Sequence, residues 1–318
     1  MEWRALGVVW AGAAALAGSL GCSSDAQNGV GSAGGSAGTS GGSTLSGGAG
    51  SVGSAGSAGL TESACLENPT ALRTQGTVLS LPLQLSLGGQ PFVFGQPNAL
   101  AAGGSLVPLN LRFYISEVEL LRSNGEAPVA VDVVTAAGAP APYGIHLFNA
   151  EEAESSTLRV LAPPGQYSGL GFALGIKLSC NQQSPAQLSD PLTALSQMTW
   201  PHTGGFLFLR YEGRYTAADS GGAAGAAPAF GSLPALHMGG DIKKERVPRV
   251  TVQGALSIPA SGTLEKGLSV VMDEIFKGAT AEIDVSDVAV GLLSAPESIA
   301  GERLRRQLPE LHAFVLEP

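Results

Sequence analysis

Basic residues are scarce in this 318-residue chain, which has 17 Lys and Arg against 26 Asp and Glu. The formal net charge is −9 and the basic residues form no cluster, so nucleic acid is not an expected partner.

Familiar catalytic signatures are missing as well, since the sequence contains neither an HExxH nor a CxxC motif. Matches to a hydrolase elbow and a dinucleotide fingerprint fall within residues 29–38, where no strand or helix is expected. The acidic run at residues 151–154 fits a solvated loop better than a catalytic pair. These features argue against an enzyme.

Residues 1–21 are typical of a secretion signal. A short positive region precedes residues 5–16, an uncharged and mostly apolar stretch that is shorter than the roughly 20 residues needed to span a bilayer. The small residues that lead into Cys22 resemble the lipobox of bacterial lipoproteins, in which this Cys becomes lipidated. Ser19 departs from the aliphatic residue usual three positions earlier, so an ordinary secretion signal is the alternative. With Ser23 in place of an Asp, the resemblance implies a cell-envelope lipoprotein anchored through Cys22 in the outer membrane, facing the periplasm or the cell surface.

The remainder divides into a tether and a domain. Residues 22–62 are rich in Gly and Ser, and residues 29–59 have too few apolar side chains to offset the entropy of ordering, which predicts a disordered tether. Residues 63–318 are long enough for one large β domain or two small ones, and we expect one β-rich domain. No further stretch reaches transmembrane length. Cys65 and Cys180 remain after processing. In an oxidising compartment they form either a disulfide or two free thiols, and the sequence leaves both open.

Alternation of apolar and polar residues predicts that the domain is mostly strand. Strands are expected at residues 79–87, 111–120, 170–178, 206–211, 250–258 and 281–285. The phase of the second strand flips near Ser116-Glu117, which indicates a β-bulge, and residues 169–175 place glycines along one face, which indicates close approach of another backbone. Helix is expected only in a short turn opened by Asp190-Pro191 and in a stripe at residues 304–311. The pattern predicts an antiparallel β-sandwich or barrel-like domain with one or two short helices.

Side chains suited to a soft metal are few. After residue 21 one Trp remains, Trp200, together with four histidines: His146, His202, His237 and His312. Trp200 and His202 are two residues apart and would share one side of an extended segment. His237 precedes Met238, and imidazole with thioether suits copper better than a hard cation. For each histidine taken singly, a surface or core role is the alternative.

Several stretches resemble, in order, the motifs of one family. They are LGGQPF at 87–92, LRFYISEV at 111–118, GQYSGLGFALG at 165–175, MTW at 198–200, GFLFLRYEG at 205–213 and LHMG at 236–239. The chain from about Leu79 to the C-terminal region is similar to the MbnP-like family, which is named for the periplasmic partner of methanobactin systems.

The resemblance implies a function. Some family members bind copper through His side chains and a Trp oxidised to kynurenine, and a di-haem partner of the cytochrome c peroxidase type performs that oxidation. By motif position, Trp200 matches the first Trp of the family's M-x-W segment, and His237 matches the His of its F-H-L-G step. The implied copper site is therefore His237 and Trp200, and His202 and His146 are further candidate ligands.

Three departures from the family pattern bear on that site. His202 replaces the second Trp of the segment, Gln182 stands where a His often lies, and Leu85 stands where some members carry a first-strand His. We therefore expect a non-enzymatic, copper-binding accessory lipoprotein. The alternative is a surface-anchored protein-interaction module that has the same fold but has lost the metal site, and a hydrolase or other enzyme is the third hypothesis.

Overall fold

The computed structural model describes residues 65–67, 76–100, 104–200, 205–216, 235–239, 247–279 and 297–318. All of them belong to one unit, Leu60–Pro318. The predicted signal and tether, His202 and the strand at 281–285 lie outside these residues. Within the described ranges, no helix has the length and apolar character needed to cross a membrane.

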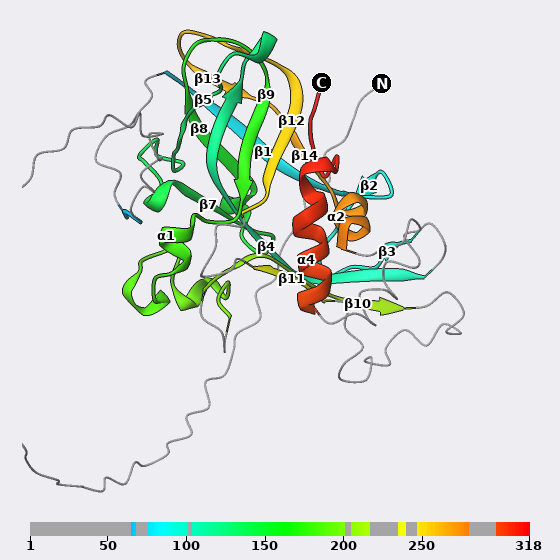
Figure 1. Ribbon diagram of the computed structural model, residues 1–318. Coiled ribbons are helices and arrows are strands. Elements are labelled where there is room, and N and C mark those ends of the chain that lie inside the picture. Colours follow the sequence, from blue (N-terminus) through cyan, green and yellow to red (C-terminus); the bar gives the residue numbers. More distant parts are fainter. Residues whose placement is uncertain are drawn as a thin grey trace, which may run out of the picture. The chain divides into compact units, whose positions relative to one another are not determined.

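Two β-sheets make up the fold (Figure 1). The first has seven strands, in the order β15–β14–β1–β8–β6 with β2 and β13 also paired to β1. Their bounds are β1 Thr77–Leu87, β2 Gln90–Pro91, β6 Asp132–Val133, β8 Thr157–Ala162, β13 Thr263–Glu265, β14 Leu268–Val271 and β15 Phe314–Leu316. β13 and β14 run parallel to β1, whereas the other pairs are antiparallel. The mainly β fold is confirmed, but this sheet contains both parallel and antiparallel pairs. The long connection from β1 to β13 allows the chain to come back to β1 and run parallel to it.

The second sheet has eight strands and is antiparallel, in the order β11–β10–β4–β9–β12 with β3, β5 and β7 paired to β4. Their bounds are β3 Asn98–Ala99, β4 Ser105–Leu121, β5 Val129–Ala130, β7 Ile145–Asn149, β9 Gly165–Leu174, β10 Leu207–Thr216, β11 Ala235–Gly239 and β12 Arg249–Ile258. The strands predicted at 111–120, 206–211 and 250–258 are confirmed. The strand predicted at 170–178 ends at Leu174 instead, because the chain leaves the sheet at Gly175, whose φ is 141°.

Two irregularities of the second sheet were predicted correctly. The register of β4 against β9 shifts between Ser116 and Glu119, and Glu117 has a φ of 49°, so the bulge is confirmed. The glycine face of β9 admits close neighbours: a Cβ on Gly169 would lie 2.3 Å from the carbonyl oxygen of Val252 on β12. A larger residue at Gly169 would therefore push the two strands apart.

Helices are short in the described residues. They are α1 Leu178–Asn181, α2 Met272–Ala279 and α4 Glu297–Gln307, with 3-10 turns η1 Ser123–Gly125, η2 Pro142–Gly144, η3 Ala153–Ser156, η4 Pro185–Gln187, η5 Ala194–Ser196 and η6 Leu308–Glu310. The C-terminal stripe is confirmed by α4. The turn predicted to open at Asp190 begins at Ala194 instead, because the Asp190 carboxylate accepts a hydrogen bond from the Thr193 hydroxyl rather than capping a helix. The peptide bond between Asp190 and Pro191 is cis.

The core lies between the two sheets. Phe314 on β15 meets the rings of Phe113 on β4 and Phe172 on β9 edge-on, with centroids 6.1 and 5.1 Å away. Phe113 also stacks on Phe148 of β7 at 4.6 Å. One face of the second sheet therefore faces the core, and its other face is turned away from the first sheet.

Candidate functional site

A row of polar side chains crosses the second sheet on the face turned away from the core. His237 on β11 is paired in register with Arg210 on β10, Arg210 with Arg112 on β4, and Arg112 with Asn149 on β7. Directly paired residues point to the same face of a sheet. The register therefore places all four side chains on one face, opposite the core-facing Phe113.

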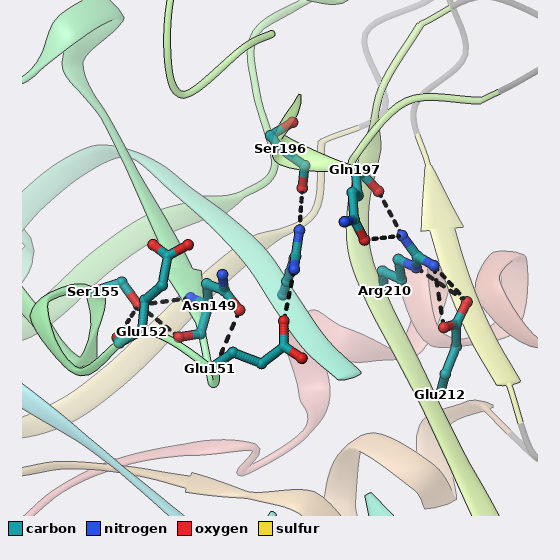
Figure 2. A network of polar contacts seen from close by, with 9 residues as sticks. Asn149, Glu151, Glu152, Ser155, Ser196, Gln197, Arg210 and Glu212 are labelled. Atoms are coloured by element: carbon teal, nitrogen blue, oxygen red, sulfur yellow. Dashed lines mark hydrogen bonds and ion pairs between the residues drawn. The ribbon is translucent and has the colours of Figure 1, made fainter. Parts of the chain in front are cut away.

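A covering segment, residues 178–200, lies over this row and binds it through backbone oxygens. Arg112 donates to the carbonyl oxygen of Ser196 at 2.7 Å, and Arg210 donates to that of Gln197 at 2.9 Å (Figure 2). Tyr114, also on β4, donates to the carbonyl oxygen of Pro191 at 2.8 Å. Strand side chains thus hold the covering segment in place.

Each arginine of the row is paired with a carboxylate that lies outside the row. Arg112 pairs with Glu151 at 2.8 Å. Arg210 binds Glu212 with two parallel hydrogen bonds of 3.0 and 3.1 Å (Figure 2). The Nε2 of His237 lies 3.1 Å from the same carboxylate. The hydrogen bond from His237 is the main reason that the pKa of Glu212 lies below its usual value, and Arg210 lowers it further although partial burial opposes both. Glu212 is therefore ionised at neutral pH.

The histidine at the end of the row has a defined tautomer when it is neutral. A carboxylate can only accept, so the hydrogen on the ring must be on Nε2 and the lone pair on Nδ1. His237 is 14% exposed and Glu212 29% exposed, so water screens this pair only in part. The arrangement fixes which ring nitrogen of His237 can act as an electron-pair donor.

Trp200, at the end of the covering segment, lies against His237. The two rings meet edge-on, with centroids 6.1 Å apart. A Cβ on Gly239 would lie only 2.3 Å from the indole Nε1, so the absence of a side chain at Gly239 lets the indole approach β11. Helix α4 packs against β11 so closely that a Cβ on Gly301 would lie 2.0 Å from the carbonyl oxygen of His237.

The other sequence-predicted candidates are not gathered here. Met238 is fully buried and, as the strand neighbour of His237, points to the core face, so the predicted pairing of imidazole and thioether is wrong. His146 is paired with Ile115 on β4. Because Ile115 is an odd number of residues from Arg112, Ile115 and His146 both lie on the opposite, core-facing side of the sheet. The Nε2 of His146 bonds to the carbonyl oxygen of Ser155 at 2.9 Å.

One further candidate, His202, lies in residues 201–204, which the structure does not describe. His312, the remaining histidine, is exposed near the C-terminus. In the described part of the chain, no three His, Cys, Asp or Glu residues come close enough together to hold a metal ion. At His237 the described residues supply one imidazole and one carboxylate, which is fewer donors than a closed metal site uses.

The disulfide fixes the entry of the chain into the domain. Cys65 is bonded to Cys180 on α1, with Cα atoms 4.8 Å apart. Tyr143 donates its backbone N–H to the carbonyl oxygen of Glu67, and Ser189 donates its hydroxyl to the Glu67 carboxylate. Of the two options that the sequence left open, the structure has the disulfide, and it joins residues 65–67 to the covering segment.

Sequence reasoning overlooked the two arginines and Glu212. The signal was available, since Arg112 lies in the LRFYISEV stretch and Arg210 and Glu212 lie in GFLFLRYEG. Those stretches were used only as markers of resemblance. Their charged residues bind the covering segment, which holds Trp200 beside His237.

Comparison with known proteins identifies the family of the chain. No curated protein matches the chain. Among solved structures, MbnP from Methylosinus trichosporium matches with a TM-score of 0.45 and 14% sequence identity, over 64% of this chain and 78% of that chain. Residues 76–293, more than half of the chain, match the MbnP family. The chain therefore belongs to the MbnP family.

Proposed function

We propose that this protein is a non-enzymatic, copper-binding accessory lipoprotein of the cell envelope, with His237 as its first metal ligand. The observation that carries the proposal is the Glu212–His237 pair. Histidines that bind metals almost always donate their other ring N–H to a carboxylate, carbonyl or water, which fixes the tautomer and raises the basicity of the ligating nitrogen. Glu212 is held for this task by two hydrogen bonds from Arg210.

The remaining ligands of this proposal come from Trp200 and the residues after it. An unmodified indole is a hydrogen-bond donor only and does not bind a metal. Oxidation to kynurenine opens the indole, leaves an aryl amine and a ketone oxygen, and releases the C2 carbon as formate, with a net gain of one oxygen and loss of one carbon. Trp200 lies beside His237 and is only partly buried, so an external oxidant can reach it. That oxidant is a di-haem partner of the cytochrome c peroxidase type, and His202 supplies a further imidazole.

Copper stoichiometry tests the proposal. Protein purified from cells that also make a di-haem partner should hold copper, and His237→Ala should abolish it. Glu212→Gln keeps an oxygen to accept from His237 but loses the charge, and should weaken copper binding by about 10- to 100-fold. His312→Ala, which replaces an exposed histidine outside this row, serves as the matched control and should leave binding unchanged. Equal copper binding by wild type and His237→Ala would refute the assignment.

The mass of the peptide that contains Trp200 provides a second, independent test. Native protein should show the mass change expected for kynurenine, whereas protein made without the haem partner should carry unmodified Trp and bind copper weakly. An unmodified peptide from cells that make the partner would instead favour the second hypothesis, a surface-anchored interaction module without metal. That hypothesis is supported by the lack of a third metal donor among the described residues.

Membrane attachment is proposed to occur through lipidation of Cys22. In Cys22→Ala, the protein should leave the membrane fraction or accumulate as an unprocessed precursor. An unchanged distribution and mass in that variant would mean that an ordinary signal peptide is removed instead.

A further inference from the structure

A cavity of about 470 Å³ lies between β7, the connection from β6 to β7, and the covering segment. This volume is within the range of small-molecule sites, roughly 300–1,000 Å³. Most of its wall is apolar, formed by side chains that include Val133, Val134, Ala141, Ile145 and Pro191. None of the residues proposed to bind copper at His237 lines it.

The charge in this wall is of one sign. Glu152 and Asp190 both line the cavity, and its described lining residues include no Lys or Arg. The Glu152 carboxylate makes no hydrogen bond or ion pair with any residue that the structure describes. Asp190 accepts only a neutral hydrogen bond, from the Thr193 hydroxyl at 2.6 Å. The nearby Arg112 is already bound to Glu151 and to Ser196. Two carboxylates in a mostly apolar wall, with no Lys or Arg among the described lining residues, favour a positively charged occupant.

His146, which also lines the cavity, adds no positive charge. A carbonyl oxygen only accepts, so Nε2 of His146 carries the hydrogen that bonds to Ser155, and Nδ1 carries a lone pair. Burial lowers the pKa of His146 to about 4, so the ring is neutral at pH 7. His146 therefore adds no positive charge to the lining of the cavity.

An exposed apolar side chain at the same place points independently to a ligand. Leu195 on η5 lines the cavity and is 86% exposed, the most exposed of the large apolar side chains in the described residues. An occupant of the cavity would cover part of this side chain and remove its apolar surface from water.

We propose that this cavity binds a small organic amine with an apolar body. The protonated amine is held by the carboxylates of Glu152 and Asp190, and the apolar body packs against the Val, Ile and Pro wall and Leu195. A bare or hydrated metal ion fits less well, because the described residues offer no cluster of three ligands and the apolar wall cannot replace a hydration shell.

Three probes of matched shape test this proposal on the full chain: 2-phenylethylamine, 2-phenylethanol and 3-phenylpropionate. Saturation-transfer NMR and calorimetry should detect binding of the amine, weaker binding of the alcohol and none of the carboxylate. A chelator is present throughout, so that an amine bound to copper is not counted. His237→Ala should bind the amine like wild type, which separates this site from the proposed copper site.

Glu152→Gln should weaken binding of the amine by about fivefold, which is the upper range for a partly exposed ion pair. Glu154→Gln is the matched control, because Glu154 lies on the same turn but not in the cavity wall, and it should bind like wild type. Leu195→Ser should weaken the amine and the alcohol alike. Equal binding of the three probes, no binding of the amine, or an equal effect of Glu152→Gln and Glu154→Gln would overturn the proposal.

Discussion

Acidification should destabilise this protein through His146, and the size of the effect follows from its burial. The pKa of His146 is lowered from 6.5 to about 4, mainly because burial penalises the charged ring, while the hydrogen bond to Ser155 opposes the shift in part. Above pH 6.5 the ring is neutral in both the folded and the unfolded chain, so it has no effect on stability. As the pH falls below 6.5, His146 becomes protonated in the unfolded chain, whereas in the folded chain it stays neutral until about pH 4.

The loss of unfolding free energy can be worked out from this difference in proton uptake. Each unit of pKa difference is worth about 1.4 kcal/mol, so the full shift corresponds to at most about 3 kcal/mol below pH 4. At pH 5 roughly 2 kcal/mol of this should already be lost. Glu212, whose pKa is lowered, contributes stability that is lost only as the pH falls below the usual range of a carboxyl group. The window from pH 6.5 to 5 is therefore dominated by histidine.

The assay compares urea unfolding of wild type and His146→Gln at pH 7 and pH 5. The amide of Gln can still donate to the Ser155 carbonyl, but it does not titrate. We expect the variant to be less stable than wild type at pH 7 from imperfect packing, and to lose about 2 kcal/mol less between the two pH values. His312→Gln, which replaces an exposed histidine, is the matched control. If wild type and His146→Gln lose the same free energy from pH 7 to pH 5, the account of His146 is refuted.

Three further predictions concern contacts around the covering segment and β11. Replacing both Cys65 and Cys180 by Ser should lower the unfolding free energy by about 5 kcal/mol, because the disulfide closes a long loop with a sequence separation of 115. Denaturant titration of the oxidised wild type and of the variant measures this difference in unfolding free energy. Gly301→Ala should lower the unfolding free energy by about 1–3 kcal/mol, because the new Cβ would clash with the backbone of β11. Thermal unfolding measures the loss, and an unchanged melting temperature would contradict this prediction. Gly239→Ala should displace the indole of Trp200, the one Trp after residue 21, and shift its fluorescence maximum, whereas an unshifted spectrum would show that the contact is not tight.

Local patterns predicted those parts of the fold that depend on local chain geometry. Alternation located β1, β4, β9, β10 and β12, and the phase flip at Ser116-Glu117 located the bulge, because the side-chain period of a strand is fixed by its own backbone. Helix α2 was missed, although its buried residues Met272, Ile275, Phe276 and Ala279 follow the helical spacing. An eight-residue stretch gives too short a pattern to stand out.

Long-range features could not be obtained in this way. Two such features are the parallel pairing of β14 with β1 and the row from His237 to Asn149. Both depend on which strands become neighbours, and the alternation of side chains along one strand does not determine its neighbours. The proximity of Trp200 and His237 was expected from family motifs rather than from any pattern in the residues. His146 was grouped with His237 because both are histidines, and only the register shows that they lie on opposite faces.

The disulfide also has a mechanical consequence. Every strand from β1 to β9 lies between Cys65 and Cys180, inside a loop that the S–S bond closes covalently. A force that pulls the two ends of the chain apart enters this loop at Cys65 and leaves it at Cys180 without stretching the segment between them. Only the strands and helices after Cys180 can be extended, so the long strand β4 and its Arg112 stay folded or unfold without bearing tension. The domain is thereby divided into a part that is shielded from pulling and a part that is not, and β10 and β11 with Glu212 and His237 belong to the second part.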